Sequence, residues 1–126
     1  MLVDGETQGD GTKTRSFIEL PIFRAKWEKL GLNDADLRRL QEELLADPKV
    51  GAVMRGTGGI RKMRFAFEDR GKSGSIRVIY IDFEVYEKIY LITAYPKNEK
   101  DNLTEGERNE LRQMIAILEK QLEENK

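Results

Sequence analysis

The sequence contains no cysteine and no histidine. The first absence excludes a disulfide framework and thiolate metal sites. The second removes both the usual general base near neutral pH and the commonest zinc ligand. Catalysis by this chain must therefore use Lys, Arg, Tyr, Asp or Glu side chains, and we expect no metal and no cofactor.

Long hydrophobic runs are also missing. No apolar segment approaches the roughly 20 residues that a membrane-spanning helix needs, and the N-terminus lacks the basic-then-apolar pattern of a signal peptide. We therefore expect a soluble, cytoplasmic protein without a membrane partner. A length of 126 residues suits one small domain.

The net charge is only -1, but the charges are segregated along the chain. Residues 55–80 hold seven cations and two anions, a sum of +5, whereas residues 1–54 sum to -2 and residues 81–126 to -4. A local basic patch can hold phosphates without making the whole protein adhesive to polyanions. A basic, solvated surface without a ligand is the alternative interpretation.

The N-terminal segment, residues 1–15, is polar and glycine-rich and shows no periodicity after Val3. Such a segment buries too little apolar surface to offset the entropy of ordering. We predict a disordered leader, followed by one domain over residues 16–126.

The next segments predict a strand and two helices. Residues 16–20 are typical of a short strand, Pro21 favours a helix start, and Gly31 ends that helix. Asn33 is a good N-cap for a second helix with leucines at helical spacing.

The second half predicts three strands and a helix. Residues 60–67, 75–83 and 88–95 read as an antiparallel meander, and Thr104 with Glu107 has capping-box spacing at the start of a final amphipathic helix. The predicted fold class is α+β, with the order β-α-α-β-β-β-α: a small antiparallel-meander sheet, two N-terminal helices and one C-terminal helix. We expect the helices on one face of the sheet.

The stretch GGIRKMRF, residues 59–66, carries cations on a core-forming strand. Alternation directs Met63 and Phe65 to one face and Lys62 and Arg64 to the other. If Arg77 on the next strand paired with Phe65, it would be a buried cation, at a cost of several kcal/mol. We therefore predict that Arg77 pairs with Arg64, provided that no bulge intervenes.

Two further segments have alternative interpretations. In AYPKNEK, residues 94–100, Pro96 ends the strand ladder, so that Tyr95, Lys97 and Asn98 project either into a site or into a solvated turn. The glycines of RGTGG, residues 55–59, either let backbone amides approach a phosphate or make a turn.

Residues 16–122 resemble the RelE and HigB toxins of bacterial toxin-antitoxin pairs, especially the HigB-like branch. The stretches GTGGIRKMR, GSIRVIY and YPKNEKDNLT carry the resemblance in the same order and spacing. It implies a RelE-like fold and a ribosome-dependent mRNA endonuclease. It also implies a cognate antitoxin, for HigB often a HigA-like helix-turn-helix protein, and mRNA on the ribosome as partners.

The resemblance assigns three residues. Lys62 and Arg64 correspond to the paired basic positions of the first meander strand, and Arg77 to the arginine that binds the scissile phosphate. These are the same three cations that the strand faces select.

Other positions depart from the family pattern. Lys97-Asn98 stands where some RelE toxins carry Lys-Arg, and Leu103 or Thr104 replaces the C-terminal catalytic tyrosine. Tyr95 is a candidate substitute for the missing ring.

Cleavage of RNA by its own 2'-hydroxyl needs in-line geometry, a proton acceptor, charge stabilisation and a proton donor. Lys62 is the candidate base, because neighbouring cations favour the neutral amine. Arg64 and Arg77 would clamp the phosphate, and Lys97 or Arg61 would assist or donate a proton. Arg61, Tyr95 and Asn98 complete the predicted RNA-binding set. The alternatives are a noncatalytic RNA- or ribosome-binding module and a protein-interaction domain.

Overall fold

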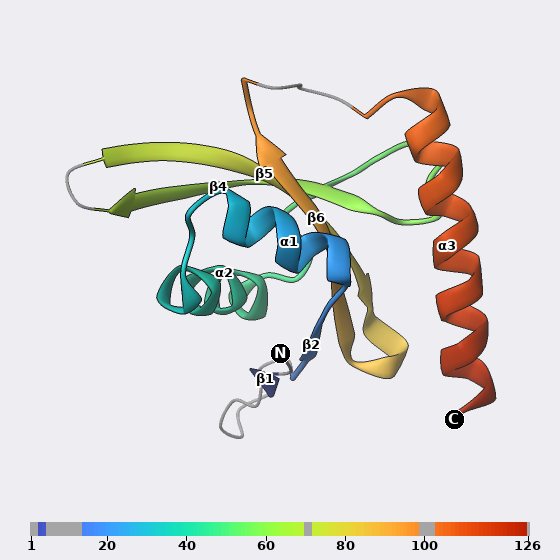
Figure 1. The fold of residues 1–126 in the computed structure, drawn as a ribbon. Coiled ribbons are helices and arrows are strands. Elements are labelled where there is room, and N and C mark those ends of the chain that lie inside the picture. Colours follow the sequence, from blue (N-terminus) through green and yellow to red (C-terminus); the bar gives the residue numbers. More distant parts are fainter. Residues whose placement is uncertain (1–2, 5–13, 70–71, 99–102, 126) are drawn as a thin grey trace.

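The computed structural model describes residues 3–4, 14–69, 72–98 and 103–125 (Figure 1). No helix in these ranges is long and apolar enough to cross a membrane. The strands are β1 (Val3–Asp4), β2 (Ser16–Glu19), β3 (Ala52–Val53), β4 (Arg61–Asp69), β5 (Lys72–Phe83) and β6 (Lys88–Pro96). The helices are α1 (Pro21–Lys29), α2 (Asp34–Ala46), the short 3-10 helix η1 (Glu84–Tyr86) and α3 (Glu105–Glu124).

The six strands form one sheet in the order β1-β2-β6-β5-β4-β3. The antiparallel meander β4-β5-β6 is confirmed, and so is the α+β class with two helices before the meander and one after it. Strand β2 pairs in parallel with β6, which makes the sheet mixed. The two-residue strands β1 and β3 at the two edges were not predicted, because two residues show no alternation.

The predicted helix boundaries follow from local capping. Pro21 occupies the first turn of α1, and the Asn33 side chain accepts a hydrogen bond from the Asp36 N–H at the start of α2. Both helices pack on one face of the sheet, where the Trp27 ring stacks on Phe23 with ring centres 5.4 Å apart and approaches Phe65. This aromatic group anchors α1 and α2 on β4.

Helix α3 lies on the opposite face, so the prediction that all helices share one face is wrong. It packs with the apolar group that contains Ile81, Phe83 and Ile92, whereas α1 and α2 pack with Val78 and Leu91. Figure 1 shows α3 well separated from α1 and α2. The physical reason is that β5 and β6 are apolar on both faces, so both faces need a cover.

A buried ion pair lies at the N-terminal side of β2. Arg15 is 4% exposed and donates to the Asp82 carboxylate through Nε at 2.7 Å and through a second nitrogen at 3.1 Å. This contact raises the pKa of Arg15 above its ordinary value. Val3–Asp4 also pairs with β2. Arg15 and Val3–Asp4 lie within the predicted leader, of which residues 1–2 and 5–13 lie outside the described residues.

The turn before β3 is tied to the centre of the sheet by Tyr80. The Gly51 N–H donates to the Tyr80 hydroxyl at 2.9 Å, and this hydroxyl donates to the Pro48 carbonyl at 2.9 Å. A Cβ at Gly51 would lie 2.9 Å from the Lys62 carbonyl oxygen, so only glycine fits there. Burial raises the pKa of the Tyr80 phenol above its ordinary value of 10.0.

We predict that Tyr80→Phe lowers the free energy of unfolding at neutral pH by about 1 to 3 kcal/mol, because two buried backbone groups lose their partner. The wild-type phenol has a raised pKa in the folded state, so its contribution is complete below pH 10.0 and is lost as pH rises through the folded pKa. When unfolding by urea is measured at a series of pH values, the free energy of unfolding should therefore fall less steeply at alkaline pH in the variant than in the wild type. Tyr86→Phe, on η1, is the control and should change neither quantity appreciably.

Candidate functional site

The pairing of β4 with β5 brings the predicted cations together. Arg64 pairs with Arg77, and Lys62 pairs with Ile79, two pairs further along the same strands and therefore on the same face. The prediction for Arg77 is confirmed, and no register shift interrupts this strand pair. Lys62, Arg64 and Arg77 therefore project from the face that α3 partly covers, and we call these three residues the cationic face.

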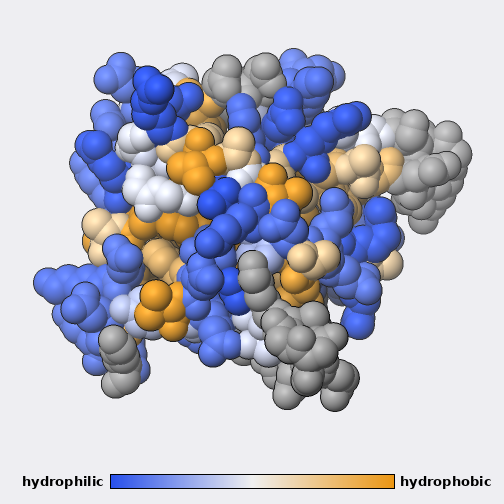
Figure 2. Space-filling view, turned by 180° about the vertical axis from the view of Figure 1, so that it is seen from behind, coloured by the Kyte–Doolittle hydropathy of each residue, from blue (hydrophilic) through white to orange (hydrophobic). Residues whose placement is uncertain are grey.

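The cationic face is accessible to solvent. Arg64 is exposed, and Lys62 and Arg77 are half-buried. Side chains directly opposite in an antiparallel pair have Cβ atoms about 4.5 to 5.5 Å apart, which is close enough for two guanidinium groups to bind one phosphate. Figure 2 shows the side of the molecule opposite to the view of Figure 1, where hydrophilic residues separate several smaller hydrophobic patches.

Tyr95 extends the cationic face onto the third strand, because it pairs with Arg77. Its ring belongs to the apolar group on the α3 side and is only 3% exposed. Stacking of an RNA base on this ring would therefore require its neighbours to move, so the ring does not offer the open platform that the sequence suggested.

Lys97 and Asn98 follow the end of β6 and are exposed. The last residue of β6, Pro96, pairs with Ile76 next to Arg77 on β5. The turn therefore places Lys97 and Asn98 at the margin of the cationic face.

Arg61 is not part of this arrangement. It pairs with Tyr80 on the face that α1 and α2 cover, and its guanidinium donates to the Gly51 carbonyl at 2.6 Å and the Lys49 carbonyl at 3.2 Å. These bonds hold the turn before β3. The structure thus separates Arg61 from the other predicted site residues.

The RGTGG loop is a closed turn. The Thr57 hydroxyl, which is buried, donates to the Met54 carbonyl at 2.6 Å and accepts from the Ile60 N–H at 3.1 Å. Gly56, Gly58 and Gly59 adopt positive φ around it. This arrangement favours the interpretation as a turn that sets the start of β4.

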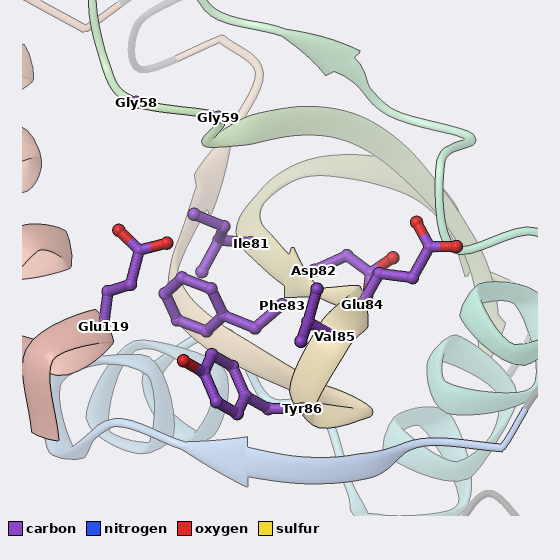
Figure 3. Close-up of a pocket in the computed structure, with 9 residues that line it drawn as sticks. All are labelled: Gly58, Gly59, Ile81, Asp82, Phe83, Glu84, Val85, Tyr86 and Glu119. Carbon is purple, nitrogen blue, oxygen red and sulfur yellow. The ribbon is translucent and has the colours of Figure 1, made fainter. Parts of the chain in front are cut away.

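The cavity in Figure 3 lies away from the predicted site residues. It has a volume of about 320 Å³ and lies between α3, η1 and the turn at Gly58 and Gly59. The Glu119 side chain reaches toward it from α3, opposite the Phe83 ring, whereas the carboxylates of Asp82 and Glu84 form ion pairs with Arg15 and Lys49. Among the described residues, no group of three or more acidic side chains is arranged to hold a metal ion. The described residues that line this cavity include no cation that could bind a phosphate.

A second cavity was not predicted from the sequence. It has a volume of about 440 Å³ and lies where α1, β6 and α3 meet. Its walls include Ile22 on α1 and Leu111 and Met114 on α3. Because α1 and α3 pack on opposite faces of the sheet, no periodicity within one segment could have indicated that these residues meet.

Comparison with known proteins identifies the family. Residues 21–126 match the family model described as the RelE toxin of the RelE/RelB toxin-antitoxin system. Among solved structures, the chain is similar to a mutant of the Escherichia coli toxin RelE in the free state, at 17% identity over 68% of this chain and 85% of that chain, with a TM-score of 0.48. The family match covers most of the chain, and this protein belongs to the RelE toxin family of toxin-antitoxin systems.

Proposed function

We propose that this toxin is an endoribonuclease of the HigB-like branch that cleaves mRNA on the ribosome. The observation that carries the proposal is the pairing of Arg64 with Arg77, with Lys62 on the same face. Like charges directly opposite in a sheet destabilise it by roughly 0.2 to 1 kcal/mol. A bound polyanion relieves this repulsion, so the arrangement is better suited to a complex with RNA than to the free protein.

The two arginines would hold the phosphate that is cut. A guanidinium group offers paired donors that match phosphate oxygens, and donors fixed on adjacent strands need little rearrangement in the transition state. Arg64 and Arg77 would therefore stabilise the extra negative charge that develops on phosphorus. The sheet, whose core includes Met63 and Val78 directly behind them, keeps their backbone in place.

Lys62 would act as the base. In its neutral form it accepts the proton of the 2'-hydroxyl, whose oxygen forms a bond to the adjacent phosphorus while the bond to the 5'-oxygen breaks. Lys97, at the margin of the cationic face, would donate a proton to the leaving oxygen. The products are a 2',3'-cyclic phosphate and a free 5'-hydroxyl, so every proton and bond is accounted for by the chain and the RNA.

The HigB-like assignment implies a specific kind of partner. RelE-family toxins belong to pairs with an antitoxin. We propose that the antitoxin here is HigA-like, with a helix-turn-helix DNA-binding domain, and that the complex acts in the cytoplasm. A gene for such a protein beside the gene for this chain would support the assignment, and a neighbouring antitoxin of another class would contradict it.

We predict that Lys62→Gln reduces cleavage of ribosome-bound mRNA by at least about 100-fold, the scale of losing a general base. RNA binding should change little, because the other phosphate contacts remain. The control is Lys120→Gln, which removes one positive charge from an exposed position on α3, outside the cationic face. This variant should cleave mRNA at the wild-type rate. If Lys62→Gln cleaves ribosome-bound mRNA as fast as the wild type does, Lys62 is not the base. If the wild type also leaves mRNA uncut, the noncatalytic RNA-binding alternative is favoured.

We predict that Arg77→Ala costs about 2 to 4 kcal/mol of transition-state stabilisation, the scale of losing one preorganised donor. The free energy of unfolding should stay equal or rise slightly, because the cross-strand repulsion with Arg64 disappears. Chemical denaturation and a ribosome-coupled cleavage assay on the same purified variant measure the two effects. A variant that unfolds easily but cleaves normally when folded would show that Arg77 is structural.

A further inference from the structure

Helix α3 carries two arginines on the flank that faces β5. Arg108 and Arg112 are four residues apart, and the same stripe continues through Ile115 to Glu119 at steps of three and four residues. Ile115 is buried in the apolar group that includes residues of β5, and Glu119 borders the cavity in Figure 3 together with Ile81 of β5. Both arginines therefore lie on the β5 side of the helix.

The direction of α3 determines which part of β5 the arginines approach. The N-terminal half of α3 lines the second cavity together with Tyr95, whereas Glu119 lines the cavity in Figure 3 together with Ile81. Because Tyr95 pairs with Arg77, the N-terminal half of α3 lies at the level of Arg77. From Glu119 back to Arg108 the helix extends about 16 Å, and from Ile81 back to Arg77 the strand extends about 13 Å. Arg108 therefore lies beside the cationic face.

The guanidinium group of Arg108 has an unused donor. Its Nε atom is shielded from solvent and has no hydrogen-bond partner among the described residues. A buried donor without a partner costs free energy, which a ligand with an acceptor oxygen would recover. Arg108 as a whole is half-buried and Arg112 is exposed, so a change of rotamer can direct this donor to a ligand at the surface.

The position of these two cations is unfavourable in the free protein. Like charges four residues apart on a helix repel each other, and the helix dipole disfavours cations near the N-terminus, where Arg108 lies. The anions of the same flank are Glu105 at its start and Glu119 near its end, so the two arginines occupy its middle. A polyanion beside α3 would relieve both effects, as it would relieve the repulsion between Arg64 and Arg77.

We propose that Arg108 and Arg112 form a second phosphate subsite, which binds a phosphate of the RNA other than the one held by Arg64 and Arg77. The proposal rests on the proposed function for the identity of the RNA as substrate. The phosphate in this subsite does not react, so Arg108 and Arg112 are positioning residues. They would fix the direction in which the RNA strand leaves the cationic face, toward the N-terminal half of α3.

The first test measures binding of the full chain to a short 2'-O-methyl oligoribonucleotide, which lacks the attacking hydroxyl and therefore stays intact. Fluorescence anisotropy at several salt concentrations gives the dissociation constant and its dependence on salt. For a single strand, each lost phosphate contact lowers the slope of log K against log salt concentration by about 0.7. We expect this change for Arg108→Gln and for Arg112→Gln, with dissociation constants about tenfold higher at low salt.

Two control variants separate a phosphate contact from a structural role. Arg38→Gln removes an exposed guanidinium from α2, which packs on the other face of the sheet, and should keep the wild-type slope. Arg108→Lys keeps the charge and should also keep the slope. The free energy of unfolding of Arg108→Gln, measured by chemical denaturation, should equal that of the wild type. An unchanged slope in Arg108→Gln, or an equal loss in Arg38→Gln, would overturn the proposal.

A neutral linkage in the RNA identifies the phosphate that is bound. Replacement of one phosphate at a time by methylphosphonate should weaken binding to the wild type at each contacted position. Arg108→Gln should be insensitive to the replacement at one of these positions, because its partner is already lost, and Arg77→Ala should be insensitive at a different one. If both variants are insensitive at the same linkage, all the arginines share one phosphate and there is no second subsite.

The cleavage assay keeps this proposal distinct from the proposed nuclease function. Arg108→Gln should raise KM for ribosome-bound mRNA with kcat unchanged, since its phosphate contact is the same before and during the reaction. If the wild type does not cleave mRNA but Arg108→Gln still loses a phosphate contact, the nuclease proposal fails and the subsite stands. If the wild type cleaves and Arg108→Gln matches it in KM and salt slope, the subsite is wrong. A variant that loses affinity only for the antitoxin would show that the arginines bind an acidic protein segment instead of RNA.

Discussion

The arrangement of the candidate site depends on one constraint, the register in which β4 pairs with β5. Met63 and Phe65 must face the aromatic group around Trp27, and their partners Val78 and Ile76 must do the same. A shift by one residue would turn these side chains to the other face and bury Arg77 in their place. The demand for apolar packing under α1 and α2 is therefore what brings the cations together on the other face.

A register shift in the pairing of β5 with β6 determines which side chain lies next to these cations on β6. Leu91 and Tyr95 are four residues apart on β6, so regular alternation would place them on the same face. Leu91 instead packs under α1 and Tyr95 under α3, because the pairing of β5 with β6 shifts register between Ile79 and Tyr80. The extra residue in β6 changes the direction of the side chains that follow. Tyr95 reaches the face of Arg77 only for this reason.

Features set by nearby residues could be predicted from the sequence, and features set by distant ones could not. Pro21, Asn33 and Thr104 each mark a helix start, because a capping bond involves residues within one turn. The pairing of Arg64 with Arg77 was predictable because a pairing of Arg77 with Phe65 would bury its guanidinium among the apolar side chains of the other face.

The errors have a common origin. The side on which α3 packs depends on apolar residues of β5 and β6, which lie far from α3 in the sequence. The ion pair of Arg15 with Asp82 joins residues 67 positions apart, and a polar, glycine-rich context gave no indication of it. The cavity where α1, β6 and α3 meet is formed by both helices, so it cannot be predicted when α3 is assigned to the wrong face of the sheet.

The separation of charge along the chain becomes a separation in space. The basic segment forms β4 and β5, whereas the acidic C-terminal part supplies η1 and α3, whose Glu84, Glu119 and Glu110 border the two cavities. Electrostatic attraction would guide a polyanion to the cations of β4 and β5 and away from the carboxylates of η1 and α3.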